Sequence, residues 1–419
     1  MNVPPPVLAE RFNGRSQARA PDLKVARHRE GETLLYVPKK SVTMIPPPTS
    51  PVFFNPAASL NRDVTVSVAA AAGVSKFCDA MAGVGARGVR VANEVQGVSE
   101  VAMVDFNPEA LKLAKRSAAA NGVSGKCTFA VAETSSFLFS RFGKDRRYGS
   151  VDLDPFGTPI RQMQAALSAT ADGGILSVTA TDTAVLCGVH VSTCSRRYGS
   201  VPLNNDFHHE TGIRILLGSL ARCAAAVDIG IEPLVAHSTK HYLRAFVRVD
   251  PGVSAADTSL SRLERFACCP GCGEVHLSSG QEGPCPVCGR KVKVAGPIWA
   301  GEVVQEQLVG SARKAALERG LTGAAEVLRS LEGVNRFPPW SFDIDRICSS
   351  LKVPTVSELS VYTRLTKGGH RVMRTPFERT GVKTDASCGE VVEAVRSASS
   401  SPVGGPRASA PRSSSIARS

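Results

Sequence analysis

From about Glu30 to Asp250, short runs of β-branched residues alternate with longer Ala- and Leu-rich segments whose apolar residues recur at helical spacing. This alternation constrains the fold strongly, because neighbouring parallel strands need a crossover connection, which is usually a helix. The pattern therefore predicts an α/β domain built on a mostly parallel, doubly wound sheet.

Seven strands are expected in this stretch, at 76–79, 100–105, 126–132, 149–154, 174–180, 233–237 and 243–249. The segment after the second strand opens with Asn107 as a cap and Pro108 in the first turn, and it stops at Asn121, which predicts a helix. The break between the last two strands is too short for a crossover helix, so we expect these strands to pair antiparallel. A parallel sheet with one antiparallel strand at its end results.

The chain has 419 residues, more than one hydrophobic core usually holds, so two or three domains are expected. No stretch contains the roughly 20 consecutive apolar residues of a membrane span, and the Pro-rich start does not resemble a secretory signal. We therefore expect no membrane contact and a cytoplasmic location. The net charge of +13 is typical of proteins that meet nucleic acid, but the terminal segments 1–29 and 396–419 hold most of that excess.

Composition divides the chain into four parts: a basic extension at 1–29, the α/β domain at 30–252, a smaller α+β domain at 253–395, and a Ser-, Arg- and Pro-rich tail at 396–419. The extension and the tail are expected to be disordered, because they have too few apolar residues to offset the entropy of ordering. In the smaller domain, residues 311–331 read as helical. Two short helices at 341–351 and 356–367, followed by a hairpin, indicate a winged-helix-like end.

A glycine-rich segment follows the first strand, with Asp79 before it and Gly83, Gly85 and Gly88 within it. Such glycines let the backbone approach a nucleoside cofactor, and an acid at the end of the second strand, Asp105, stands where ribose hydroxyls are bound. The spacing alone also fits a dinucleotide site or a plain tight turn. The carboxylate of Asp79 favours the cationic methionine part of S-adenosylmethionine over a pyrophosphate.

The fourth strand ends in Asp152-Leu-Asp154-Pro-Phe156-Gly157, at the sheet edge where open α/β folds bind their ligands. A carboxylate at Asp154 is suited to accept an N–H from a nucleobase amine, and the ring of Phe156 offers a face for an extruded base. The plainer alternative is that Asp154 caps the next helix and Phe156 belongs to the core. Asp152 points to the other side of the strand and is expected to be structural.

Two Cys-x-x-Cys turns, each followed by glycine, lie about twelve residues apart at 268–292. Four thiolates in this arrangement suit a tetrahedral, closed and therefore structural zinc site, in a module that resembles a zinc ribbon. Cys268 and His276 are spare donors. The expected ligands are Cys269, Cys272, Cys285 and Cys288.

Other ionisable groups carry weaker signals. The run His208-His209-Glu210 lacks the helical i, i+4 spacing of a hydrolytic zinc motif, and His237 with His241 spans a strand break. The eight remaining cysteines lie mostly in apolar or Ala-rich contexts and are expected to be small core residues.

Several longer strings support a more specific hypothesis, and together they cover roughly residues 30–390. They are Pro51-Val-Phe53-Phe54-Asn55-Pro56, Asn61-Arg62-Asp63, Gly85-Ala-Arg87-Gly88, Asp152-Leu-Asp154-Pro-Phe156-Gly157, Leu186-Cys-Gly188, His209-Glu-Thr-Gly212 and Gly296-Pro-Ile-Trp299. In these strings the chain resembles the tRNA (guanine-26-N2)-dimethyltransferases.

The resemblance implies a Rossmann-like class I methyltransferase domain and a C-terminal domain specific to the family. It implies transfer of one and then two methyl groups from S-adenosylmethionine to the exocyclic N2 amine of guanine 26 in tRNA.

It also assigns roles to residues. It implies that Arg62, Arg87 and Asp105 bind the cofactor, that Asp154 is essential, and that Phe53 and Phe156 lie beside the target base. Glu133-Thr134 stands where the family usually has Asp-Ala near the adenine, so this cofactor contact is a departure from the family pattern.

Two other classes of function remain open at this point. A nicotinamide oxidoreductase explains the glycine-rich segment but gives no role to Asp154 or Phe156. A noncatalytic RNA-binding protein explains the basic tails and predicts no cofactor binding. With the resemblance included, we expect a monomeric enzyme whose partner is tRNA and whose metal is a structural zinc.

Overall fold

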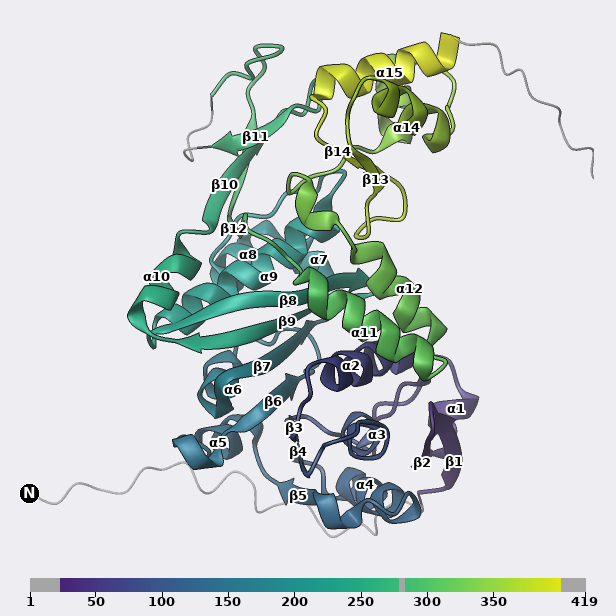
Figure 1. Cartoon of the computed structure of the whole chain (residues 1–419), viewed down its shortest axis with the longest axis vertical. Helices are drawn as coiled ribbons and strands as arrows, with labels where there is room; N and C mark the ends of the chain where they lie inside the picture. Colours follow the sequence, from purple (N-terminus) through teal and green to yellow (C-terminus); the bar gives the residue numbers. More distant parts are fainter. Residues whose placement is uncertain (1–22, 279–282, 401–419) are drawn as a thin grey trace, which may run out of the picture.

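The computed structural model describes residues 23–278 and 283–400. Its centre is a seven-stranded sheet in the order β5-β4-β3-β6-β7-β9-β8 (Figure 1). The strands are β3 (Lys76–Asp79), β4 (Glu100–Asp105), β5 (Cys127–Val131), β6 (Tyr148–Leu153), β7 (Thr170–Ala180), β8 (Ile229–Thr239) and β9 (Tyr242–Pro251). All seven predicted strands are present, so the α/β class predicted from the alternating pattern is confirmed.

The antiparallel part of the sheet differs in one respect from the prediction. β8 and β9 pair antiparallel, as expected, but β9 also pairs antiparallel with β7. The antiparallel strand is therefore second from the edge, and β8 forms the edge itself. The two-residue turn at Lys240 and His241 makes β8 and β9 neighbours, and β9 takes the inner position beside β7, where most of its residues are buried.

Helices cover both faces of this sheet (Figure 1). One face carries α2 (Ser59–Ala71), α3 (Ala86–Glu94) and α4 (Pro108–Ala120), and the other carries α5 (Thr134–Phe139), α6 (Met163–Ala169) and α9 (His208–Ala225). Two short helices, α7 (Thr183–Leu186) and α8 (Val191–Tyr198), connect β7 to α9. The predicted cap of α4 is confirmed, because the Asn107 side chain accepts hydrogen bonds from the Glu109 and Ala110 amides.

A hairpin precedes the sheet and was not expected from the sequence. It consists of β1 (Val25–Glu30) and β2 (Thr33–Pro38), followed by α1 (Lys39–Thr43). Residues 25–29 of the predicted disordered extension are therefore ordered, because β1 pairs with β2, whose Leu35 and Val37 are fully buried. Residues 1–22 lie outside the described part of the chain.

The region after β9 begins with α10 (Val253–Leu260) and a three-stranded sheet in the order β11-β10-β12, made of β10 (Leu263–Cys268), β11 (Val275–Ser278) and β12 (Lys293–Trp299). Next come α11 (Glu306–Glu318) and α12 (Thr322–Leu331), where the sequence predicted one helical segment. The break falls at Gly320, whose φ of +67° ends α11. Both helices pack against α2, so they extend the first hydrophobic core.

A second hydrophobic core begins only at Phe342. It is formed by α13 (Ile344–Leu351), α14 (Glu358–Lys367), the hairpin of β13 (Val372–Arg374) and β14 (Val382–Thr384), and α15 (Cys388–Ser400). The order of two helices and a hairpin agrees with the predicted winged-helix-like end. The first hydrophobic core thus continues past residue 252, and the domain boundary expected there stays a prediction. Helix α15 includes residues 396–400 of the predicted tail, and 401–419 lie outside the described residues.

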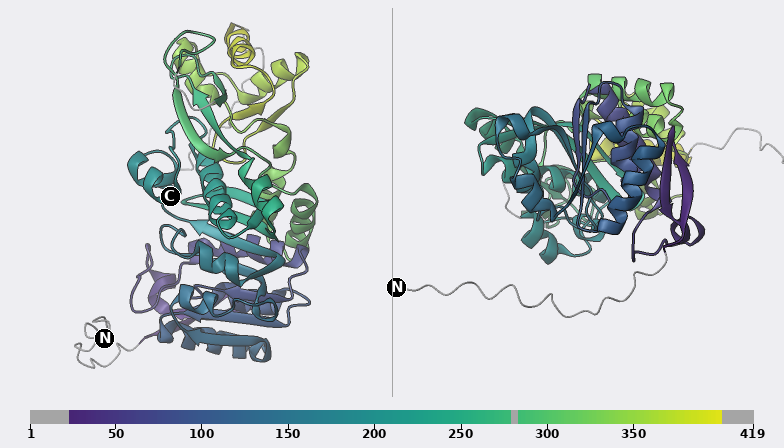
Figure 2. Two further views of the ribbon diagram at one scale, coloured as in Figure 1. Left: turned by 90° about the vertical axis from the view of Figure 1, so that its left-hand side faces the viewer. Right: turned by 90° about the horizontal axis from the view of Figure 1, so that it is seen from below.

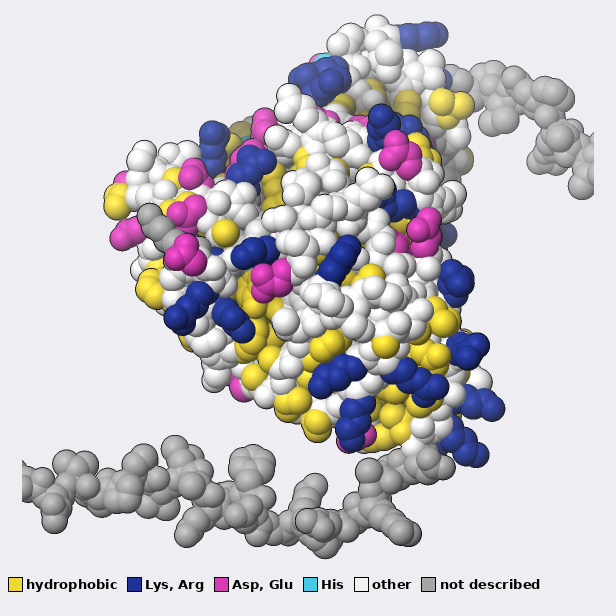
Figure 3. Space-filling view, turned by 60° about the horizontal axis from the view of Figure 1, so that its bottom comes forward, with side chains coloured by type: hydrophobic (Ala, Val, Ile, Leu, Met, Phe, Trp, Pro, Cys, Tyr) yellow, Lys and Arg dark blue, Asp and Glu magenta, His cyan; other side chains and the backbone are white. Residues whose placement is uncertain are grey.

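These parts form an elongated molecule with the seven-stranded sheet towards one end and the second core at the other (Figure 2). Lys and Arg side chains gather over the end formed by α4 and the β1–β2 hairpin (Figure 3). Exposed residues of this basic end are Lys24, Arg27, Arg29, Lys39, Lys40, Lys112, Lys115 and Arg116.

Candidate active site and metal centre

The glycine-rich loop lies at the carboxyl end of β3 and leads into α3. Gly83 and Gly85 have φ angles of +53° and +73°, which L-residues with side chains rarely adopt. A Cβ at Gly85 would lie 2.6 Å from that of Ala114, and one at Gly88 would lie 2.7 Å from Cγ of Met103. Glycine is therefore required here both for the turn and for the close packing of α3 on β4 and α4.

The two acids predicted for the cofactor site lie at the ends of neighbouring strands. Asp105 Oδ2 accepts a hydrogen bond of 2.7 Å from the Gly83 amide, so this carboxylate is held against the glycine-rich loop. Asp79 is only 2 % exposed, and its Oδ2 accepts a hydrogen bond of 2.9 Å from the Gly88 amide. Burial raises the pKa of Asp79 to about 7, although Arg87 acts in the opposite direction. Asp79 thus supports the loop from below, whereas Asp105 faces its surface.

Arg87 connects the loop to the carboxylates of β6. Its guanidinium donates a hydrogen bond to Oδ2 of Asp154. Its Nε lies 3.1 Å from Oδ1 of Asp152. The remaining nitrogen donates to Asn61 Oδ1 at 2.8 Å and to Thr65 Oγ1 at 2.6 Å. Arg87, predicted as a cofactor ligand, therefore holds Asp154 directly.

Asp152 and Asp154 have very different surroundings, although two residues that far apart in a strand would point to the same face. The reason is that β6 ends at Leu153, so Asp154 lies beyond the strand. The Asp154 side chain is 29 % exposed, whereas that of Asp152 is fully buried. Burial opposes ionisation of Asp152, but the charges of Arg244 and Arg87 and a hydrogen bond from Ser177 outweigh it and lower its pKa. Asp152 therefore lies out of reach of a substrate, whereas Asp154 is the carboxylate that a substrate can reach.

Two aromatic rings meet near the end of β6, one of them two residues after Asp154. Phe53 and Phe156 make an edge-to-face contact with ring centroids 4.8 Å apart, and Phe156 is 75 % exposed. The loop that carries Phe53 passes over the glycine-rich loop, because the Phe53 carbonyl lies 3.8 Å from the position of a Cβ on Gly83. The structure therefore brings together residues that are about 100 positions apart in the chain. It excludes the alternative in which Phe156 is a core residue.

The other predicted cofactor residues are engaged locally. The Nε of Arg62 donates a hydrogen bond of 2.7 Å to the Glu30 carboxylate, and a second nitrogen of its guanidinium donates to the Asn55 carbonyl. The Glu133 carboxylate caps α5 by accepting hydrogen bonds from the amides at 135 and 136, which outweigh the effect of desolvation and lower its pKa. Thr134 donates to the Ala80 carbonyl, at 3.0 Å, and so lies close to the end of β3.

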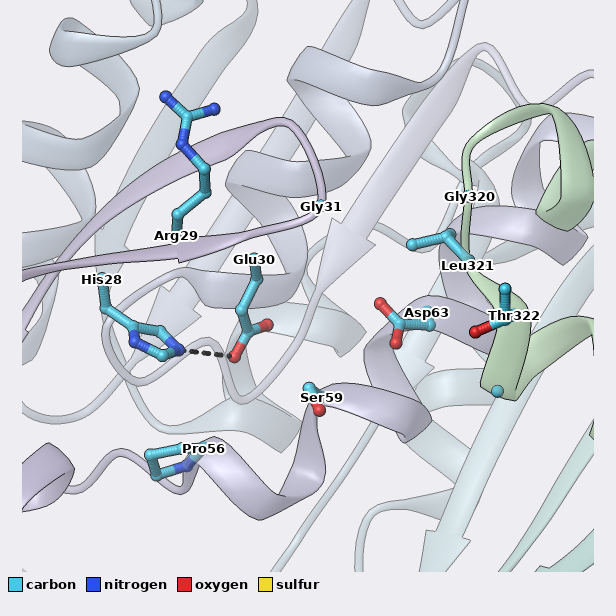
Figure 4. Close-up of a pocket in the computed structure, with 11 residues that line it drawn as sticks. His28, Arg29, Glu30, Gly31, Pro56, Ser59, Asp63, Gly320, Leu321 and Thr322 are labelled. Atoms are coloured by element: carbon cyan, nitrogen blue, oxygen red, sulfur yellow. Dashed lines mark ion pairs between the residues drawn. The ribbon is translucent and has the colours of Figure 1, made fainter.

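A hollow of about 370 Å³ lies beside the β1–β2 hairpin rather than at the glycine-rich loop (Figure 4). Residues of the β1–β2 hairpin, the start of α2 and the α11–α12 turn line it, among them His28, Glu30, Asp63 and Leu321. Its two carboxylates are already paired, since Glu30 binds Arg62 and Asp63 binds Arg90. We therefore centre the candidate active site on Asp154 and the glycine-rich loop.

The four predicted zinc ligands converge. The sulfur atoms of Cys269, Cys272, Cys285 and Cys288 all lie within 4.8 Å of one another. The Gly271 amide donates to the Cys269 sulfur, and the Val287 amide donates to the Cys285 sulfur, each at 3.4 Å. Burial raises the pKa of Cys269, but the amide donors of Cys272 and Gly271 outweigh it and lower the pKa to about 7. Four sulfur donors, two of which already accept hydrogen bonds from backbone amides, fit a tetrahedral zinc ion.

A second group of possible ligands does not fit a metal as well. His208, His209 and Glu378 converge, but Nδ1 of His209 lies 2.5 Å from Oε2 of Glu378, which is a hydrogen-bond distance. His208 Nδ1 pairs with the Asn205 carbonyl. The neighbouring Glu210 is fully buried and binds Arg214 and Lys383 instead. The expectation that residues 208–210 form no metal motif stays a prediction.

With this geometry established, comparison with known proteins identifies the family. The family model for N2,N2-dimethylguanosine tRNA methyltransferases matches residues 31–396. The chain belongs to this family.

Relatives within the dimethylguanosine tRNA methyltransferase family cover most of the chain. The tRNA (guanine(26)-N(2))-dimethyltransferase of Methanothermobacter thermautotrophicus is 35 % identical over 375 residues, which are 87 % of this chain and 97 % of the relative. The enzyme of the same name from Methanosarcina acetivorans is 35 % identical over 394 residues, with 88 % and 98 % covered. The fold is similar to that of Trm1 from Pyrococcus horikoshii, solved in complex with S-adenosyl-L-methionine, at a TM-score of 0.77, 31 % identity and coverage of 88 % and 99 %.

Three residues of the site escaped the sequence analysis. Glu30, the partner of Arg62, lies in a strand that the sequence did not predict. Arg244 on β9 is fully buried beneath Asp152. Phe106, directly after Asp105, is 81 % exposed at the carboxyl end of β4. A large apolar residue directly after an acid at a strand end is a signal that could have revealed Phe106, whereas Arg244 has no local sequence signal.

Proposed function

We propose that this protein transfers methyl groups from S-adenosylmethionine to the exocyclic N2 amine of guanine 26 in tRNA, giving N2-methyl- and then N2,N2-dimethylguanine. The observation that carries this proposal is the environment of Asp154. Its carboxylate is anchored by Arg87, which follows the glycine-rich loop, and it lies two residues before Phe156, whose ring contacts that of Phe53. Family membership supplies the substrate class, since the relatives are named for this reaction.

The residues at the glycine-rich loop fit S-adenosylmethionine. Gly83 leaves open backbone at the turn, with no atom closer than 3.8 Å to where a Cβ would lie. Asp105 offers a carboxylate for ribose hydroxyls, and the exposed ring of Phe106 offers an apolar face for a base. Arg62, Asp79, Gly85, Arg87, Glu133 and Thr134 complete the set of cofactor residues that we propose. When bound, the cofactor supplies a methyl group on a cationic sulfur.

Asp154 then acts on the other reactant. The exocyclic amine of guanine is a weak nucleophile because its lone pair is delocalised into the ring. Accepting its N–H at Oδ1 places electron density on the nitrogen and orients it for attack. Within the described residues this oxygen has no hydrogen-bond partner, since Arg87 engages Oδ2. Phe53 and Phe156 hold the extruded base by stacking, and the amine proton passes to Asp154 and from there to water.

The cysteine centre has a separate role. Cys269, Cys272, Cys285 and Cys288 offer four ligands and leave no open position, so a zinc ion there would stabilise the small sheet of β10, β11 and β12. The site lies outside the set of residues around Asp154. We propose a structural zinc.

Partners and location follow from the proposed reaction. Within the described residues, no helix is long and apolar enough to cross a bilayer. We propose that the enzyme acts as a monomer on tRNA and works in the cytoplasm, where its substrate is found.

The test is single-turnover methyl transfer to tRNA with Asp154→Asn. The substitution keeps the shape of the side chain but removes the charge that accepts the amine proton, so the rate should fall about 10²-fold or more. Calorimetry should show nearly unchanged cofactor affinity. A near-normal rate would exclude Asp154 as the proton acceptor.

Phe156→Ala is the matched control, since it leaves the carboxylate intact. It should weaken productive tRNA binding by about 1–3 kcal/mol through lost stacking, and the rate at saturating tRNA should be largely retained. Nucleoside mass spectrometry of the product distinguishes methylation at guanine 26 from methylation elsewhere.

A further inference from the structure

Arg244 is a fully buried cation with no access to solvent, and its surroundings extend to the active site. It lies on β9 opposite Thr179 of β7, to whose hydroxyl it donates a hydrogen bond. Its NH2 donates to Oδ2 of Asp152 and, at 3.0 Å, to Oγ1 of Thr65. The guanidinium also lies 4.6 Å from the ring centroid of Phe246.

The contacts continue from Asp152 to the surface. Its second oxygen, Oδ1, lies 3.1 Å from Nε of Arg87, and Arg87 in turn donates to Oδ2 of Asp154. Thr65 accepts hydrogen bonds from both arginines. Four charged side chains thus form one chain, Arg244–Asp152–Arg87–Asp154, of which only Asp154 is appreciably exposed.

Stability does not explain this arrangement. Removing charges from water costs more than their mutual attraction usually returns, and apolar residues would fill the same volume at lower cost. The chain of charges also ends at the residue to which the proposed function assigns proton acceptance. A role in that reaction is the more economical explanation.

We propose that Arg244 is a positioning residue for methyl transfer: it binds one oxygen of Asp152, so that Arg87 stays on Asp154 and fixes the orientation of its carboxylate. This inference rests on the proposed function. Without Arg244, the unbalanced charge of Asp152 would draw the Arg87 guanidinium inward and away from Asp154. The free oxygen of Asp154 would then lose its fixed direction towards the amine.

The charges around Asp154 determine what each substitution does to the pH dependence. The ionisable groups that face it are Arg87 on α3, Asp79 on β3, Asp152 on β6, and Arg244 and Tyr242 on β9. Removing a cation from this set should move the acid limb of the rate profile to higher pH. Removing an anion should move it to lower pH.

The experiment measures single-turnover methyl transfer to tRNA as a function of pH for Arg244→Met and Asp152→Asn. Arg244→Met should lower the plateau rate by on the order of tenfold to a hundredfold, the effect of misplacing a reacting group. Its acid limb should shift upward by about one pH unit, whereas that of Asp152→Asn should shift downward. If the acid limb of the pH–rate profile stays at its wild-type position in both Arg244→Met and Asp152→Asn, the proposal is wrong.

Conservative and double variants separate positioning from folding. Arg244→Lys keeps the charge without the fork of donors, so it should restore the position of the acid limb but only part of the rate. The double variant Arg244→Met/Asp152→Asn removes one charge of each sign and should return the limb towards the wild-type position. If Arg244→Met does not fold, Asp152→Asn and Arg244→Lys decide the question: an unmoved acid limb in Asp152→Asn, or a displaced acid limb in Arg244→Lys, contradicts the proposal.

Two controls complete the design. Lys383→Met removes another fully buried cation, which donates to Glu210 at 2.7 Å, far from any contact with Asp154. It should lower the melting temperature without moving the acid limb. Asp154→Asn, measured in parallel, distinguishes the two proposals. A near-normal rate in Asp154→Asn contradicts the proposed function. A strongly reduced rate in Asp154→Asn, together with an unchanged acid limb in Arg244→Met and Asp152→Asn, contradicts only this inference.

Discussion

At the residue scale, the buried carboxylate of Asp79 makes the folded state sensitive to pH. Its pKa rises from 3.8 to about 7 on folding because burial disfavours the charge. The folded state therefore binds this proton more tightly, so the stabilisation is complete below about pH 4 and is lost as the pH rises through 7.

Asp79→Asn should remove this dependence while keeping an acceptor for the Gly88 amide. Calorimetry at pH 5 and pH 8 should show a smaller decrease in Tm for the variant than for the wild type. Asp172→Asn, at an exposed surface pair with Arg147, is the control and should behave like the wild type. An unchanged decrease in Asp79→Asn would show that other groups cause the pH dependence.

The same residues show what a sequence can and cannot reveal about a site. Asp154 and Asp105 were found because each ends a strand that has a clear β-branched pattern. The contact of Arg87 with Asp154 could not be found in this way, because the direction of a side chain from the first turn of α3 depends on how the helix packs. Arg244 belongs to a strand whose pattern marks it as buried, but its partners come from three other elements.

At the scale of elements, the strands of the main sheet were predicted closely because buried parallel strands are continuous apolar runs bounded by turn residues. The β1–β2 hairpin was missed because β1 contains charged residues that alternate with half-buried ones. The break between α11 and α12 was missed because a single glycine inside an amphipathic pattern is often tolerated.

The cysteine module gives a prediction at this scale. Its small core contains Ala267, Cys269, Cys285 and Val292, which is too little apolar surface for an independent fold. Cys272→Ser should therefore lower zinc content, measured by atomic absorption, and the melting temperature together. Cys223→Ser, on α9 away from the four sulfur atoms, is the control and should keep the metal. A Cys272→Ser protein that loses zinc at unchanged Tm would contradict a structural role.

At the scale of the whole molecule, two hydrophobic cores are joined by a buried ion cluster. Lys383 of β14 donates to Glu210 of α9, and Glu210 also binds Arg214, whose guanidinium reaches the Trp299 carbonyl at 2.9 Å. The sequence could not reveal this connection, because Glu210 and Lys383 are 173 positions apart. The cluster ties the winged-helix-like end to the helix that follows the active-site strands.

The basic end of the molecule gives the last prediction. Lys40 is exposed on α1, directly before the loop that carries Phe53 over the glycine-rich loop. A phosphate contact there would hold tRNA close to the catalytic site, and each such contact adds about one to the slope of log affinity against log salt. Lys40→Glu should therefore weaken tRNA binding and reduce that slope by about one or more. Lys126→Glu carries the same charge change at the opposite, amino-terminal edge of the sheet, just before β5, and should leave the slope unchanged. Equal effects of the two substitutions in filter-binding titrations would show that net charge, rather than this surface, governs the attraction.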